Sequence, residues 1–242
     1  MAQATGLGDV GAEPARRHQP ALHGGLRHQR AQGCAADGPA LTTGPAVNPA
    51  RHWLRLCATL AALSLLAGAL PTARLDWQPG LAAIQPWRAV TAAFVHWTPL
   101  HLAANLAGCA VLGLLGWRAQ LGARESLAGL IALPLTQLAL LLRPELLHYG
   151  GLSGVLHGLA AVAALSLMRR RGRERWVGAG MALGLFAKIA LEAPLGPVLK
   201  ATPGFDFPVA PFAHLCGAWA GMLAWGLTMP VMNRLMRSPH GT

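Results

Sequence analysis

The sequence is poor in charged side chains, and acidic ones are the scarcest. Only 12% of the 242 residues are charged, and just nine residues are Asp or Glu, whereas an average soluble domain carries about 25% charged residues. Hydrophobic residues make up 53% of the chain. This composition excludes an ordinary soluble enzyme.

Metal-binding and disulfide patterns are also missing. The four cysteines, Cys34, Cys57, Cys109 and Cys216, are scattered without a CxxC pair, which predicts neither a zinc site nor a disulfide framework. The chain also lacks the HExxH motif of zinc proteases. We therefore expect no metal and no other cofactor.

The positive charge is abundant but confined to a few segments. The net charge is +11, and most of the twenty Lys and Arg residues lie in the first 55 residues, in 169–175, or beside the chain's other apolar runs. Such placement is typical of the cytoplasmic flanks of membrane helices. It argues against nucleic acid as a partner.

Apolar runs cover most of the chain after residue 52. They are 53–70, 100–117, 126–142, 151–168, 176–191 and 212–232. Each approaches the roughly 20 residues that cross a bilayer as a helix, and continuous Leu and Ala favour helices over the alternation of a barrel. Pro99 and Pro211 suit the first turn of two of these helices. We predict an all-α, polytopic bundle of six transmembrane helices.

Two parts of the chain differ in composition. Residues 1–50 are rich in Gly, Ala, Pro, Arg and His without periodicity, which predicts a disordered cytoplasmic tail. Residues 51–237 are predicted to form the membrane domain. Placing the N-terminus in the cytoplasm also places most basic residues there, so both termini are predicted to be cytoplasmic.

Four polar residues occur at similar depth in three of the predicted helices. His101 and Asn105 begin the second run, Ser153 begins the fourth and His214 begins the sixth, and all three runs have the same direction. Polar side chains in a bilayer are costly and usually face the bundle interior. We therefore expect these residues to meet near the outer surface.

Ser153 and His214 are the candidate nucleophile and general base. Ser153 lies between glycines, with Gly151 allowing a tight turn before it, and a helix N-terminus there would offer N–H groups to an anion. Gly217 and Gly221 give the helix of His214 a smooth face for a close neighbour. If that neighbour carries Ser153, the two side chains come within hydrogen-bond reach. The alternative is that the small residues only pack helices.

Two further positions support this chemistry. His101 and Asn105 share a helix face and can both donate hydrogen bonds to an oxyanion, or they form a structural polar pair. His157, one turn after Ser153, is placed to stack under or orient His214. Because no buried Asp is available for that task, packing or His157 must orient the base. Lys188 also permits a Ser–Lys dyad, although snorkelling to the surface explains it more simply.

In this order, the motifs resemble the rhomboid family of intramembrane serine proteases. They are Trp87-Arg88, His101-x-x-x-Asn105, Gly151-Leu152-Ser153-Gly154 and Ala213-His214-x-x-Gly217-x-x-x-Gly221, within roughly residues 52–237. The resemblance implies that Ser153 is the nucleophile, that His214 is the base, and that His101, Asn105 and the Ser153 N–H bind the oxyanion. Trp87-Arg88 would belong to the first outer loop.

Within the family, the segment from Gly151 to Gly158 is most similar to the rhombosortase subfamily, where His157 replaces an aromatic residue typical of bacterial rhomboids. That similarity implies a bacterial inner-membrane enzyme. Its partners would be membrane lipid and transmembrane protein substrates that carry a C-terminal Gly-Gly motif, an apolar helix and a basic cluster.

Two other functions remain open. One is a catalytically inactive rhomboid-like protein that binds membrane helices. The other is a proton or metal transporter lined by histidines, namely His96, His101, His148, His157 and His214. The absence of an evident internal repeat argues against the transporter.

Overall fold

A computed structural model describes residues 48–237, with side chains described for residues 48–228. The tail predicted for residues 1–50 therefore lies almost entirely outside the described residues. So does Cys34.

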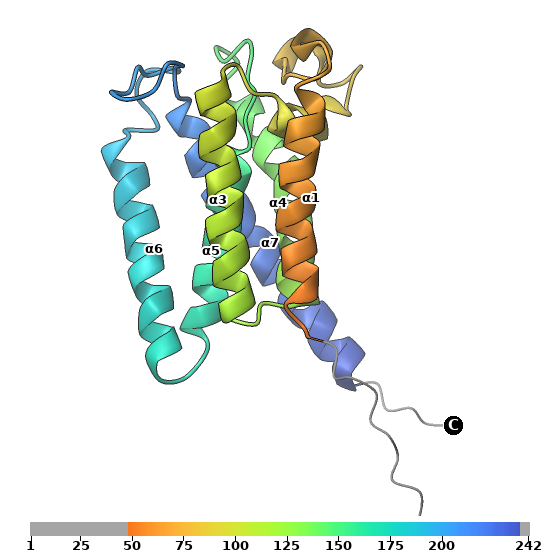
Figure 1. Ribbon diagram of the computed structural model, residues 1–242, viewed down its shortest axis with the longest axis vertical. Helices are drawn as coiled ribbons and strands as arrows, with labels where there is room; N and C mark the ends of the chain where they lie inside the picture. Colours follow the sequence, from red (N-terminus) through yellow and green to blue (C-terminus); the bar gives the residue numbers. More distant parts are fainter. Residues whose placement is uncertain (1–47, 238–242) are drawn as a thin grey trace, which may run out of the picture. The chain divides into compact units, whose positions relative to one another are not determined.

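Within residues 48–237, every regular element is a helix, and the only β-type pairings are isolated bridges. Figure 1 shows the long helices standing side by side. Their bounds are α1 (Arg51–Ala67), α2 (Arg88–Thr91), α3 (Pro99–Arg118), α4 (Ala123–Leu138), α5 (Ser153–Met168), α6 (Arg173–Leu191) and α7 (Pro211–Arg237). Short 3₁₀ turns are η1 (Thr72–Arg74), η2 (Pro79–Leu81), η3 (Ala92–Phe94) and η4 (Ala139–Leu142).

The long helices follow the predicted apolar runs, with shifted ends. α3 and α7 begin at Pro99 and Pro211, as predicted, because proline lacks only an N–H that the first helical turn leaves unpaired. Among the described residues, α3 and the continuous segment Ala123–Leu142 are long and apolar enough to cross a membrane by themselves, and α5 is apolar but shorter. The predicted all-helical fold is confirmed for the described residues.

The outward faces of the bundle carry large apolar side chains. Those at least half exposed include Leu66, Val111, Leu142, Trp176, Leu183 and Phe186. In water such a surface would be unfavourable, because each square ångström of exposed apolar area costs about 25 cal/mol. Hydrocarbon chains are the solvent that suits it.

α5 is the central helix of the bundle. Val155, Leu159 and Val162 are fully buried, and α5 contacts α3, α4, α6 and α7, most extensively α7. Figure 1 shows α5 and α7 running behind α3. A helix that is apolar on all sides and surrounded by others is a suitable rigid base for a polar site.

Glycines bring α5 and α7 into backbone contact. A Cβ atom on Gly217 would collide with the carbonyl of Gly154, and one on Gly221 would collide with the carbonyl of Gly158. The sequence predicts a close neighbour for the face of Gly217 and Gly221 without naming it, and the structure shows that this neighbour is α5. Only residues without a side chain permit helices to approach so closely.

An ion pair organises the segment between α1 and α3. Arg88 is buried, lies 3.0 Å from a carboxylate oxygen of Asp76 and donates to the carbonyl of Ala73. The neighbouring residue Trp77 forms a bridge with Tyr149, just before α5. Arg88 therefore holds this segment together, and the bridge between Trp77 and Tyr149 ties the segment to the loop that precedes Ser153.

Candidate active site

Ser153 is the first residue of α5, and the preceding turn presents it. Gly151 has φ +136°, donates its N–H to the carbonyl of Ala92 and accepts a hydrogen bond from the Tyr149 hydroxyl. A side chain at Gly151 would also lie 2.8 Å from His101 Nε2. Glycine is therefore required at this position for both conformation and space. The first N–H groups of α5 have no partner within the helix.

His214 lies in the first turn of α7, opposite Ser153. Its Nε2 is 3.1 Å from Ser153 Oγ, and the residue is only 4% exposed. The glycine contacts between α5 and α7 set this separation, because they fix the distance between the two helix backbones. The structure thus brings together the two residues that the sequence predicts as nucleophile and base.

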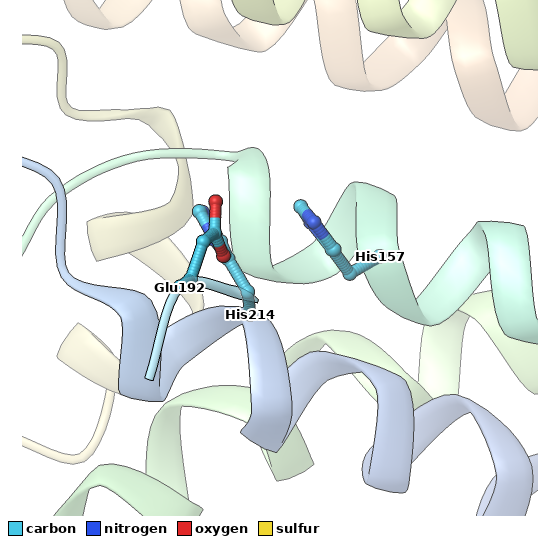
Figure 2. Close-up of side chains that lie close together, drawn as sticks. All are labelled: His157, Glu192 and His214. Atoms are coloured by element: carbon cyan, nitrogen blue, oxygen red, sulfur yellow. The ribbon is translucent and has the colours of Figure 1, made fainter. Parts of the chain in front are cut away.

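Glu192 is a site residue that the sequence analysis missed. It directly follows α6, and its Oε2 lies 2.6 Å from His214 Nδ1. The close-up in Figure 2 shows Glu192, His214 and His157 in one group. The sequence predicts that packing or His157 orients His214, and the structure adds a carboxylate beside Nδ1 of this histidine. The available signal was an acidic residue next to an otherwise apolar run.

The charge of Glu192 is stabilised locally. Burial raises the pKa of its carboxyl, but hydrogen bonds from His214 and Lys188 lower the pKa by more, and the net shift is downward. The group is therefore ionised at neutral pH and can only accept hydrogen bonds. Lys188 lies one turn earlier on α6 and pairs with Glu192. This contact gives Lys188 a role other than the Ser–Lys dyad.

His157 lies directly under His214. The two rings stack with centroids 4.1 Å apart and planes inclined by 10°. His157 Nδ1 is also 2.7 Å from the Ser153 carbonyl oxygen, which can only accept, so Nδ1 donates. The geometry matches the predicted stacking position and fixes the tautomer of His157.

His101 and Asn105 occupy the first two turns of α3 and are both buried. Thr98 caps the helix by accepting from the His101 N–H, and the His101 ring stacks on Phe207 at 4.1 Å. Asn105 Nδ2 donates to the His101 backbone carbonyl. One amide hydrogen of Asn105 is thus used inside the helix, and the second remains for another acceptor.

One cavity joins these residues. It has a volume of about 700 Å³ and extends from the site along α3 and α5 towards Val111, with α6 on its other side. The site residues that line it are His101, Asn105, Ser153, His157, Glu192 and His214. A second cavity, of about 460 Å³, reaches Ser153 and His101 from the loops beside Asp76 and His148. The site is thus reached from two directions.

The same group offers potential metal ligands. Ligand atoms of His157, Glu192 and His214 all lie within 4.8 Å of one another. However, imidazole lone pairs lie in the ring plane, and two stacked, nearly parallel rings direct them side by side rather than towards one point. The hydrogen bonds of His214 to Ser153 and Glu192 use both its ring nitrogens. The arrangement suits proton transfer better than metal binding.

Comparison with known proteins agrees with this geometry. The family description "Rhomboid domain" matches residues 83–230, more than half of the chain. The chain therefore belongs to the rhomboid family, whose members are integral membrane proteins and generally intramembrane serine proteases. The comparison with curated proteins found no match.

Proposed function

We propose that this protein is an intramembrane serine endopeptidase that uses Ser153 and His214. The observation that carries the proposal is the 3.1 Å contact between Ser153 Oγ and His214 Nε2, at the meeting point of the two cavities. A serine hydroxyl is a weak nucleophile until an adjacent base removes its proton. Here the base, the hydroxyl and space for a peptide occur together.

The proposed reaction has two halves. Ser153 Oγ attacks the peptide carbonyl while its proton passes to His214 Nε2, and a tetrahedral oxyanion forms. The C–N bond then breaks, His214 returns the proton to the leaving amine, and an acyl-enzyme remains. Water attacks the ester by the same route, releasing the carboxylic acid and restoring Ser153. No cofactor takes part in these steps.

The oxyanion is proposed to be bound from two helices. The Ser153 N–H, at the unpaired start of α5, supplies one donor, and His101 and the free amide hydrogen of Asn105 supply others. Two contacts support the proposed role of His101 Nε2 as a donor. The atom lies beside Gly151, and the ring is held in place by stacking on Phe207. Gly151 contributes by leaving room for the imidazole.

The substrates are proposed to be transmembrane proteins. The larger cavity is lined by apolar side chains of α3, α5 and α6 below the polar site. An unwound end of a substrate helix could occupy it while the rest of that helix stays in lipid. The second cavity offers water a path from the outer loops.

The proposed topology has six spans with both termini cytoplasmic, in a bacterial inner membrane. It is supported by the arginines of the 169–175 link at one end of α5 and α6 and by the polar site at the other. A reporter inserted in 169–175 should be cytoplasmic, and one beside Asp206 should be external. The opposite pattern would place the site on the wrong face.

We further propose the sorting role of a rhombosortase, with C-terminal Gly-Gly helices as substrates. The sequence from Gly151 to Gly158, with His157 stacked under the base, supports it. Each glycine weakens a helix by about 1 kcal/mol relative to alanine, so a Gly-Gly pair exposes a carbonyl. Replacing Gly-Gly with Leu-Leu should block cleavage, whereas changes in the middle of the helix should not. Equal cleavage would leave a general rhomboid protease.

The test of the proposed function is cleavage in proteoliposomes. The purified full chain should cut a reconstituted single-span substrate with a Gly-Gly outer end, and the Ser153→Ala protein should not. Helix binding without cleavage by either protein would favour an inactive helix-binding protein. Proton or metal flux through the liposomes, unchanged in Ser153→Ala, would favour the histidine-lined transporter.

A further inference from the structure

We propose that Glu192 is a positioning residue for His214 and completes a Ser–His–Glu arrangement, an inference that rests on the proposed function. The carboxylate lies 2.6 Å from Nδ1 of a histidine whose Nε2 faces the serine. It comes from the end of α6, whereas Ser153 and His214 belong to α5 and α7. Three separate helices therefore converge on one hydrogen-bonded chain.

The helix dipole does not favour an acidic residue at this position. Glu192 is the residue that caps the C-terminus of α6, where the helix dipole disfavours negative charge. The next residue, Ala193, has φ +52°, a left-handed conformation that costs free energy for any residue with a Cβ atom. Both the negative charge at the helix end and the left-handed conformation of Ala193 are locally unfavourable, and both occur where the carboxylate points at His214. Such costs are found where a site benefits from them.

The carboxylate settles which nitrogen of His214 carries the proton. An ionised carboxylate has no hydrogen to donate, so Nδ1 must be protonated, and Nε2 is then the free lone pair that faces Ser153 Oγ. Without an acceptor at Nδ1, the other neutral tautomer becomes available, and it has a hydrogen on Nε2 and cannot accept the serine proton.

Glu192 and His157 restrain different motions of His214. The face-to-face stack with His157, at 4.1 Å and 10°, fixes the plane of the His214 ring but permits rotation within that plane. A hydrogen bond at the ring edge stops that rotation. The two contacts together hold Nε2 towards Ser153, which neither does alone.

The competing explanation is that Glu192 only pairs with Lys188. The two residues are four apart at the end of α6, and their contact is more exposed than the contact with His214. Replacing Lys188 removes that pair but leaves the carboxylate against His214. Replacing Glu192 removes both contacts, so the two changes separate the explanations.

The experiment measures the rate at which the full chain in detergent reacts with a fluorophosphonate, and kcat and KM for the Gly-Gly substrate. In the labelling step Ser153 Oγ bonds to phosphorus, fluoride leaves, and the serine proton passes to His214. Loss of an orienting carboxylate costs about 10⁴-fold in a buried serine-protease triad. Because Glu192 is only half-buried, we expect Glu192→Gln to lower the labelling rate and kcat by about 10²-fold or more, with little change in KM.

Four further variants complete the test. Glu192→Asp should recover part of the rate, and added formate should accelerate Glu192→Ala but not the unsubstituted protein, because Glu192 borders the cavity and a small carboxylate can reach its place. Lys188→Met should retain most of the rate. Glu145→Gln makes the same change at an exposed glutamate paired with Arg143 and should change nothing.

The outcomes separate this inference from the function on which it rests. Full activity of Glu192→Gln, together with an inactive Ser153→Ala, would overturn the positioning role and leave the protease intact. Equal losses in Lys188→Met and Glu192→Gln would also overturn it. Loss of labelling on chelation, restored by Zn²⁺, would show a metal site instead. If Ser153→Ala is labelled and cleaves normally, the proposed function itself fails.

Discussion

The two helices that flank α5 contribute to the site in different ways. α7 meets α5 along glycines, backbone against backbone, and this contact sets the distance between Ser153 and His214. α6 also packs on α5, where Gly178 lies against the backbone of Ala164 and Met168 near the opposite end. At the active-site end, Glu192, the residue that follows α6, brings a carboxylate to His214.

The two contacts meet two different requirements of the proposed proton transfer, namely the distance between Ser153 and His214 and the orientation of the His214 ring. Close packing of the α5 and α7 backbones fixes where Ser153 and His214, the proposed nucleophile and base, lie, because a close-packed interface tolerates little adjustment. A hydrogen bond fixes how the base is oriented and where its proton lies. The first requirement depends on the absence of side chains on α5 and α7, and the second depends on one carboxylate.

The largest effect is expected for the pair that spans the α5–α7 interface. Ser153→Ala should abolish proteolysis with folding unchanged, His214→Ala should act similarly, and the double variant should be little worse than either, since residues that act as a unit are not additive. The measurement is kcat/KM in proteoliposomes. Ser64→Ala is the control, because the Ser64 hydroxyl is buried without a partner on α1. Additive losses would show that the two residues do not share a step.

The next effect concerns α3, which contributes to the site from outside the α5–α7 pair. His101→Ala and Asn105→Ala should each lower kcat by about 10²- to 10³-fold, because each removes one oxyanion donor. Single-turnover rates at saturating substrate would measure this. If neither rate changes, the two residues have only a structural role. The hydrogen bond from Asn105 to the His101 carbonyl would then be part of that role.

The α5–α7 interface itself can be broken with one methyl group. Gly217→Ala would place a Cβ atom against the Gly154 carbonyl, which should cost about 1–3 kcal/mol of stability. Activity should also fall by about 10²-fold, because displacing the helices by about 1 Å would separate Ser153 from His214.

Gly226→Ala is the matched control on α7. Nothing lies within 4 Å of a Cβ atom there, so this change should leave activity intact and raise stability slightly. Thermal unfolding and kcat/KM of both variants would check this. Equal behaviour of the two variants would disprove the role of backbone contact.

The smallest effect on activity is expected for His157, which stacks on the His214 ring. His157→Phe should keep an aromatic ring stacked on His214 and lose only the hydrogen bond to the Ser153 carbonyl. The activity should fall by less than about tenfold, because one neutral hydrogen bond contributes about 1 kcal/mol. His157→Ala should lose more, because the ring plane is then free. A ranking of kcat/KM with alanine above phenylalanine would contradict a stacking role.

The sequence predicts the backbone contact between α5 and α7 better than the side-chain pairs between loops and helices. Gly217 and Gly221, four residues apart, mark a face for close packing, and Ser153 follows a glycine turn, so the approach of α5 and α7 can be anticipated. The helix starts at Pro99 and Pro211 are likewise local signals, because they depend on proline's missing N–H.

Glu192 and Arg88 show why the rest is not predicted. The partner of Glu192 is 22 residues away on another helix, and nothing in the local sequence indicates how far the chain turns back after α6. Similarly, the sequence places Trp87 and Arg88 in an outer loop but does not pair Arg88 with Asp76, 12 residues earlier. Such pairs depend on how loops pack in the tertiary structure, and loop packing leaves no periodic pattern in the sequence.

The most direct measurement is the site of a covalent fluorophosphonate adduct on the full chain, mapped by mass spectrometry. We predict one adduct, on Ser153, that forms on the unsubstituted protein and is lost in His214→Ala. An adduct on another serine would contradict the central claim. So would labelling of Ser153 at an unchanged rate without His214.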